Sequence, residues 1–207
     1  MPLKVEEVLS KIESFSKELG LDLSRPADRF KWFLASILFA KRISAEIAKK
    51  TYRRFEEEKL TTPKSILEAG WDRLVEVLDS GGYVRYDFST ASNILECMRK
   101  LVEEYGDLEE VHRRAVDARD LEARLKEFKG VGPVAVNIFL RELRGIWRKA
   151  DPKVSGMAVK VAKKVGLSDP KPYESALVRI SLEYCKKKRC VDCPISIFCK
   201  KREDIKQ

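Results

Sequence analysis

Apolar residues recur every three or four positions along most of the chain, which is the period of a helix with one buried face. Thr62 and Pro63 form a helix start, with Thr62 as the cap and Pro63 at the first helical position. No segment alternates with the period of a strand, so the pattern predicts an all-α protein of roughly ten helices. The segments with helical spacing are Val5–Leu19, Phe30–Leu38, Ile43–Phe55, Leu74–Leu78, Ile94–Tyr105, Leu121–Phe128, Pro133–Leu143, Met157–Val165 and Tyr173–Tyr184.

The charge balance points to an anionic partner. The chain has 207 residues and a formal net charge of +9. Nucleic acid is the usual partner of such a surplus, because each phosphate contact releases counterions, and a solubilising basic surface is the alternative. No apolar run approaches the roughly 18 residues of a membrane span, so we expect a soluble, cytoplasmic protein.

Two glycines, Gly130 and Gly132, flank Val131 between two helical segments. Such glycines permit a turn with positive φ and let a ligand approach the bare backbone. Pro133 suits the first position of the next helix. The amides of a turn at a helix N-terminus can face a phosphate, and Val131 would be an apolar plug between the helices. An ordinary glycine-rich connection is the alternative.

Four of the five cysteines fall within fifteen residues near the C-terminus: Cys185, Cys190, Cys193 and Cys199. Four soft ligands so close together favour a metal over disulfides in a reducing compartment. Tetrahedral zinc and an iron–sulfur cluster both accept four thiolates, and spacing alone does not choose between them. Cys97 stands alone in a helical stripe and is expected in the core.

Leu125–Leu143, with the sequence LKEFKGVGPVAVNIFLREL, resembles the helix-hairpin-helix of endonuclease III and related DNA glycosylases. The last two gaps between the cysteines, two and five residues, match the loop that ends these enzymes, while the first gap, four residues, is shorter. The resemblance runs from about Arg29 to Cys199. It implies a two-lobed fold, with one lobe at 24–146 and the other at 1–23 plus 147–207, and bent DNA between them.

The resemblance also implies ligands and partners. Lys129 and the hairpin residues Gly130–Gly132 would bind a backbone phosphate of double-stranded DNA, and Lys41 and Arg42 would enter the duplex or hold a phosphate. The four cysteines would hold a [4Fe-4S] cluster, with zinc as the alternative. We expect a monomer that associates with the nucleoid through DNA.

A pocket for a flipped base is expected at the helix around Phe39 and at the loop Gly81–Tyr83. Tyr83 or Tyr86 would stack on the base there, with ordinary packing as the alternative for each. The single histidine, His112, lies in an arginine-rich stretch that is expected to be exposed, and it is given no role.

Removal of a base leaves positive charge on the sugar, which a carboxylate can stabilise. Related enzymes carry an Asp for this purpose at the start of the helix after the hairpin helix. Asp151, seventeen residues after Val134, is the candidate, and a competing alignment places Ser155 there instead.

Relatives that also cut the strand carry a Schiff-base Lys where this chain has Val134. The resemblance therefore implies a monofunctional glycosylase that removes a damaged or mismatched base. One alternative is a non-catalytic DNA-binding relative that keeps the hairpin and the cluster. Another is a zinc-stapled helical protein that binds RNA or a protein.

Overall fold

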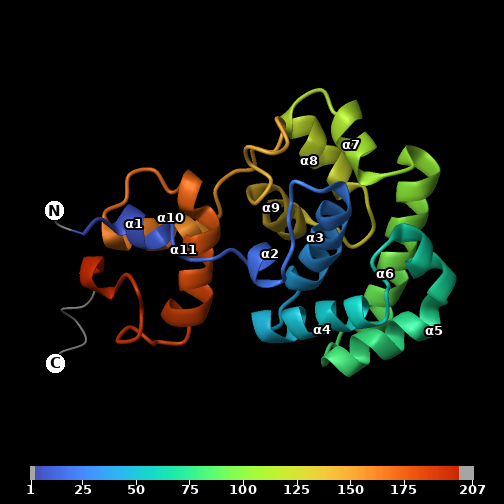
Figure 1. The fold of residues 1–207 in the computed structure, drawn as a ribbon, viewed down its shortest axis with the longest axis horizontal. Coiled ribbons are helices and arrows are strands. Elements are labelled where there is room, and N and C mark those ends of the chain that lie inside the picture. Colours follow the sequence, from blue (N-terminus) through green and yellow to red (C-terminus); the bar gives the residue numbers. More distant parts are fainter. Residues whose placement is uncertain (1–2, 201–207) are drawn as a thin grey trace. The chain divides into compact units, whose positions relative to one another are not determined.

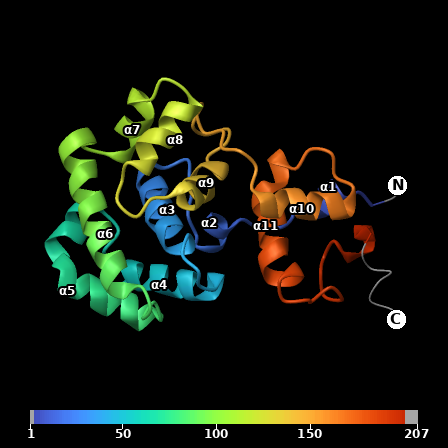
Figure 2. The same cartoon turned by 180° about the vertical axis from the view of Figure 1, so that it is seen from behind.

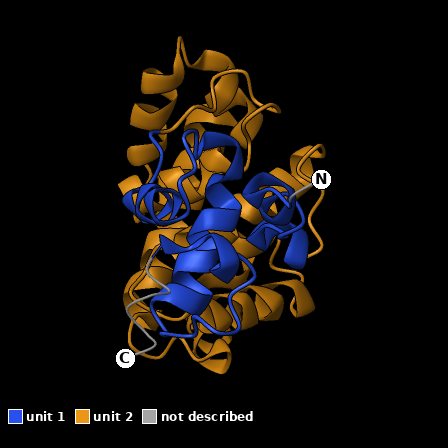
Figure 3. Cartoon of the chain, turned by 90° about the vertical axis from the view of Figure 1, so that its left-hand side faces the viewer, with its two compact units in different colours: residues 1–18, 153–207 blue, residues 19–152 orange. Residues whose placement is uncertain are grey.

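The computed structural model describes residues 3–200, and every regular element among them is a helix (Figure 1), which confirms the all-α class for that part of the chain. The chain divides into two compact units, residues 19–152 and residues 1–18 with 153–207 (Figure 3). Residues 1–2 and 201–207, which the sequence analysis assigned to the second lobe, lie outside the described residues. Among residues 3–200, no helix is both long and apolar enough to cross a membrane.

The unit of residues 19–152 contains the hairpin. Its elements are α3 (Pro26–Phe39), α4 (Ala45–Glu57), α5 (Pro63–Gly81), α6 (Asp87–Lys100), the π-helical turn η1 (Leu101–Tyr105), α7 (Leu108–Arg114), α8 (Ala118–Lys126) and α9 (Pro133–Arg141). It begins before residue 24 because the Arg29 guanidinium donates to the carbonyls of Leu23 and Ser24, both at 2.8 Å. These bonds join the incoming chain to α3.

The core of this unit forms around α3. Phe33 is 1% exposed and meets Phe139 of α9 edge to face, with ring centroids 5.3 Å apart. On another side it meets Phe128, which precedes the glycine hairpin, at 6.1 Å. Burying an aromatic side chain of this size contributes about 2–3 kcal/mol. The packing therefore ties the segment before the hairpin to the most buried helix of the unit.

Helix ends follow the local sequence. The Thr62 hydroxyl accepts from the Ser65 amide, and the Ser65 hydroxyl accepts from the Thr62 amide. The predicted start of α5 is thus confirmed, and it is a capping box. The end of α5 is fixed by Gly82, whose φ of +94° is left-handed. Gly70 interrupts α5 with φ +74° and ψ −177°, which the apolar pattern did not predict. In both opposite views α5 and α6 lie side by side (Figures 1 and 2).

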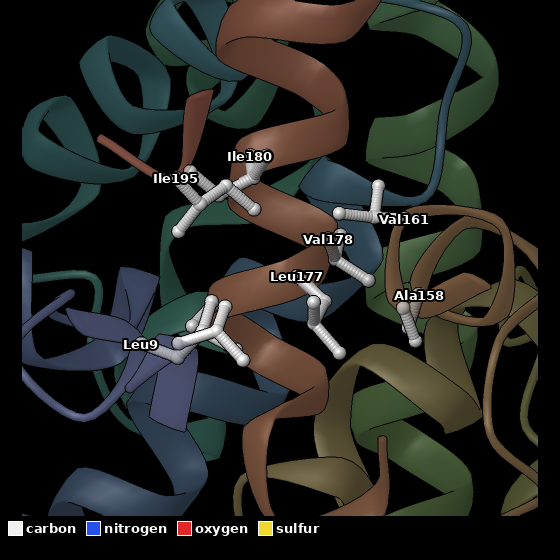
Figure 4. Close-up of a cluster of buried hydrophobic side chains, with 10 residues drawn as sticks. Leu9, Ala158, Val161, Leu177, Val178, Ile180 and Ile195 are labelled. Atoms are coloured by element: carbon white, nitrogen blue, oxygen red, sulfur yellow. The ribbon is translucent and has the colours of Figure 1, made fainter. Parts of the chain in front are cut away.

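The other unit contains α1 (Val5–Leu9), α2 (Phe15–Glu18), α10 (Gly156–Val165), η2 (Lys171–Tyr173), α11 (Glu174–Ile180), η3 (Ser181–Cys185) and η4 (Ser196–Phe198). Figure 4 shows its core, in which Leu9, Val161, Leu177 and Ile195 gather from α1, α10, α11 and the cysteine loop. Cys185 and Cys193 pack against the same cluster. The cysteine loop therefore packs against the core of this unit, and Ile195 is its buried member.

The prediction of one continuous helix over Val5–Leu19 is wrong, because the chain turns between α1 and α2. The Ser10 hydroxyl donates back to the Glu7 carbonyl at 3.0 Å, and Ser14 accepts from the Lys17 amide at 3.4 Å. Serine side chains compete in this way with the helical hydrogen bonds of the backbone. The serines occupy polar positions and leave the apolar period unchanged. The pattern alone therefore predicts a continuous helix.

The expectation that His112 is exposed is also wrong. Its ring stacks on Trp147, with centroids 4.6 Å apart and an angle of 7° between the planes. The Trp147 indole N–H donates to the Glu109 carboxylate at 3.2 Å. Burial lowers the pKa of His112, the charges of Lys149 and Arg29 add to this, and Glu109 opposes it. The folded unit therefore favours the neutral imidazole.

This arrangement predicts a pH-dependent stability. Because the unfolded chain takes up the His112 proton first, the stabilisation is present above about pH 6.5 and is lost as the pH falls toward the lower folded pKa. His112→Phe keeps an aromatic ring on Trp147 and removes the proton. We expect the melting temperature of the wild type to fall more than that of His112→Phe between about pH 7.5 and about pH 5.5. Equal falls in both proteins would contradict the assignment.

Candidate nucleic-acid interface

The connection between α8 and α9 contains the two glycines of the predicted hairpin. Gly130 adopts φ +79°, which favours glycine over any residue with a side chain. The Val131 amide donates to the Phe128 carbonyl at 3.0 Å and closes the turn. Gly132 is the N-cap of α9, and Pro133 takes the first helical position. The backbone thus reverses within a few residues and leads directly into a helix.

The Val131 side chain is buried, as expected for an apolar plug. It is 3% exposed, while the residues on both sides of it are partly or fully exposed. Its burial fixes the direction of the neighbouring backbone groups, since the side chain cannot leave the core without a cost of about 2 kcal/mol. The hairpin is therefore a rigid feature of the larger unit.

The outer side of the hairpin is open. Lys129, Gly132, Pro133 and Val134 are all exposed, with Val134 at 57%. No side chain caps the N-terminus of α9. The first amides of a helix have no partner within the helix, and together with the helix dipole they favour an anion. Lys129 adds a positive charge to the same turn.

The structure brings two further predicted segments together. Lys41 and Arg42 follow the end of α3, and the Tyr83 hydroxyl donates to the Leu38 carbonyl at 2.8 Å in the last turn of that helix. The connection after α3 therefore lies beside the connection between α5 and α6. Arg42 is exposed and Lys41 is half-buried.

Close packing at Gly81 supports this arrangement. A side chain on Gly81 would come within 2.6 Å of the Thr51 backbone in α4. Thus Gly81 is needed for the approach of two helices, and the φ of Gly82 is needed to end α5. Both glycines place the start of the loop that follows.

The Tyr83 ring is packed inside its unit and is not available for stacking on a base. Its side chain is 1% exposed, and its hydroxyl is taken by Leu38, so the packing alternative holds. Tyr86 is half-buried, with the Arg85 guanidinium 5.7 Å from its ring centre. The apolar groups that this region presents to solvent are Val84, at 63%, and Phe88, at 61%.

Asp151 lies in the extended segment before α10. Its side chain is 51% exposed, and its carboxylate is 3.6 Å from Nε of Arg144. The same guanidinium donates to the Pro152 carbonyl at 2.6 Å. These contacts fix the segment that carries the carboxylate, and Asp151 is the last residue but one of its unit.

Ser155 belongs to the other unit and is the N-cap of α10. Its hydroxyl accepts from the Ala158 amide at 3.3 Å. Its own amide donates to the Glu174 carboxylate at 2.8 Å, and Glu174 is 1% exposed. The sequence analysis missed Glu174, because an acidic residue in the first turn of a helix is ordinary and nothing in the pattern shows that it is buried. Glu174 fixes the start of α10 from within the core.

The four C-terminal cysteines are free thiols and all are half-buried. Burial raises the pKa of the Cys185 thiol, Lys164 opposes the rise, and the thiols of Cys190 and Cys199 add to it. The Cys193 thiol shows the same main cause and is influenced by the other three thiols. Within residues 3–200, no three His, Cys, Asp or Glu side chains are placed to hold a metal ion. The four thiols are close in the sequence and are donors of the kind that zinc and iron–sulfur clusters take, but the structure does not bring three of them together as ligands.

Comparison with known proteins gives no assignment: the chain matches no protein-family model and no curated protein sequence.

The two glycines of the hairpin are expected to respond differently to substitution. Gly130→Ala places a side chain at positive φ and 2.9 Å from Cβ of Asn93. It should cost about 1–3 kcal/mol of unfolding free energy. Gly132 has extended backbone with φ −90° and ψ −179°, and a side chain there meets nothing within 4 Å.

We therefore expect Gly132→Ala to leave the denaturant midpoint almost unchanged, and Gly130→Ala to lower it clearly. Comparable losses in the two variants would contradict the open packing around Gly132.

Proposed function

We propose that this protein binds double-stranded DNA and removes a damaged or mismatched base from it, as a monomeric relative of endonuclease III with a two-lobed helix-hairpin-helix fold. The observation that carries the proposal is the hairpin at Gly130–Gly132. It has a positive-φ glycine, a buried central valine and an exposed, uncapped helix start. Such a turn suits one phosphate of the DNA backbone, and the net charge of +9 favours the same partner.

In this proposal the hairpin positions the protein and other residues select the base. Lys129 and the amides at Gly132 and Val134 would hold a phosphate. Lys41 and Arg42 would contact the duplex beside the connection between α5 and α6, which carries the exposed Val84. These contacts are independent of sequence, so they serve an enzyme that must search undamaged DNA, in the nucleoid, for a rare lesion.

The chemical step proposed is hydrolysis of the glycosidic bond. A water oxygen would bond to the sugar carbon as the bond to the base breaks, and the proton of that water would pass to the leaving base. The carboxylate of Asp151 would stabilise the positive charge that develops on the sugar. The exposure of Asp151 allows contact with a substrate, and Arg144 holds its segment. Val134 has no amine to form a Schiff base, so the product would be an abasic site in an uncut strand.

A second candidate, the non-catalytic DNA-binding relative, is favoured by the geometry of Ser155. In the competing alignment this residue takes the place of the family's catalytic Asp. It caps α10 with its hydroxyl, and a hydroxyl carries no charge to stabilise a sugar cation. If this alignment is the correct one, Asp151 is a turn residue.

Base release from a panel of lesion-containing and mismatched duplexes separates the two candidates. For the enzyme, strand breaks appear only after alkali, and Asp151→Asn slows base release at least about 100-fold with unchanged DNA affinity. Asp72→Asn, at an exposed position of α5, is the matched control and should keep full activity. Retained activity in Asp151→Asn would remove this residue from the mechanism.

Absence of base release, with salt-sensitive DNA binding intact, would support the non-catalytic relative. In that case Ser155→Asp is expected to introduce base release, because it restores a carboxylate at the cap of α10.

The same resemblance proposes a [4Fe-4S] cluster held by Cys185, Cys190, Cys193 and Cys199, with zinc as the alternative. When bound, the metal would cross-link the cysteine loop next to the core of its unit. The purified protein should be brown and absorb near ~400 nm, since thiolate-bound zinc is colourless. Cys190→Ser should lose the absorbance and the buried Cys97→Ala should keep it. A protein without iron or zinc would contradict both forms of the proposal.

A further inference from the structure

The hairpin touches a polar side chain that comes from a different helix. Asn93, in the middle of α6, lies directly against the bare Cα of Gly130. A side chain built on Gly130 would come within 2.9 Å of Cβ and 3.3 Å of Nδ2 of Asn93. Two helical turns further along α6, Lys100 pairs with Glu127, just before the hairpin, at 3.3 Å. One face of α6 therefore runs along the hairpin segment.

The side-chain amide of Asn93 has no structural role among the described residues. The side chain is half-buried, and none of the described residues forms a hydrogen bond with its amide. An apolar or small residue would fill the same space beside Gly130 without the desolvation cost of an amide that is partly removed from water and has no protein partner. Asparagine occurs only twice in the chain, at Asn93 and Asn137. The position thus carries a donor that the folded chain itself does not use.

We infer that Asn93 is a further DNA-binding residue, and that its Nδ2 group donates a hydrogen bond to the phosphate held by the hairpin. This inference rests on the proposed function. The side chain is short and is held between α6 and the turn, so it can offer the donor with little loss of conformational freedom. The amide donates only through the hydrogens of its planar nitrogen, so it restricts the direction of the phosphate oxygen more than a flexible lysine does.

The experiment measures affinity for an undamaged duplex and compares four proteins. Asn93→Asp has the same shape, but it replaces the donor with a negative charge that repels phosphate. Asn93→Ala removes the donor alone. Ser92→Asp is the control, because it adds the same charge one residue away, where Ser92 accepts from the Trp71 indole at 2.9 Å.

We expect Asn93→Asp to bind at least about tenfold more weakly than wild type, Asn93→Ala a few-fold to about tenfold more weakly, and Ser92→Asp within about threefold. Melting temperatures identify any variant that is not folded, and Asn93→Ala decides the question if Asn93→Asp unfolds. Wild-type affinity in a folded Asn93→Ala, or equal losses in Asn93→Asp and Ser92→Asp, would overturn the inference.

A scan with single methylphosphonate linkages distinguishes a phosphate contact of Asn93 from a purely structural role. Each linkage removes the charge of one phosphate. If Asn93 contacts a phosphate, the loss of affinity caused by Asn93→Ala diminishes at one linkage and persists at the others. A penalty that persists at every linkage contradicts the contact. Failure of the wild type to bind any duplex would instead refute the proposed function itself, and the inference with it.

Discussion

The hydrogen bond from the Val131 amide to the Phe128 carbonyl, with the burial of both side chains, is the contact on which the candidate site depends. Phe128 packs on Phe33 at the centre of the larger unit, so the turn is anchored in its core. With Val131 held inside, Gly130 must take positive φ and Gly132 must face outward. The backbone groups that would meet a phosphate are therefore placed by apolar packing, and no part of their arrangement requires a charged side chain.

Most of the secondary structure could be predicted from the sequence, because helix starts and stops are local. Thr62–Pro63 specifies a cap, and Gly81–Gly82 specifies the end of α5. The break between α1 and α2 could not be predicted, since it depends on serine hydroxyls that leave the apolar period intact. His112 was placed on the surface because its neighbours are arginines, while its stack on Trp147 joins residues far apart in the chain. Contacts between residues far apart in the chain cannot be predicted from local composition.

The candidate site shows the same division. The hairpin is a continuous stretch, so its residues could be named in advance. Asn93 and Glu174 could not be named in advance. Asn93 contacts Gly130, and Glu174 accepts from the Ser155 amide, and both contacts arise only through tertiary packing. For the chemical step, sequence and structure leave two positions of different character. Asp151 is an exposed carboxylate paired with Arg144, and Ser155 is a capped helix start without charge. Under the proposed function, the distinction between an enzyme and a binding protein depends on which of them would face the sugar.

The central claim is that the hairpin holds a DNA phosphate through its backbone. The most direct measurement follows the backbone amide chemical shifts of the protein by NMR during titration with an undamaged duplex. The account predicts that the amides of Gly130, Gly132 and Val134 shift together on binding, and that the shifts diminish as salt is raised. Salt-sensitive DNA binding with these amides unchanged, and shifts confined to other parts of the chain, would contradict it.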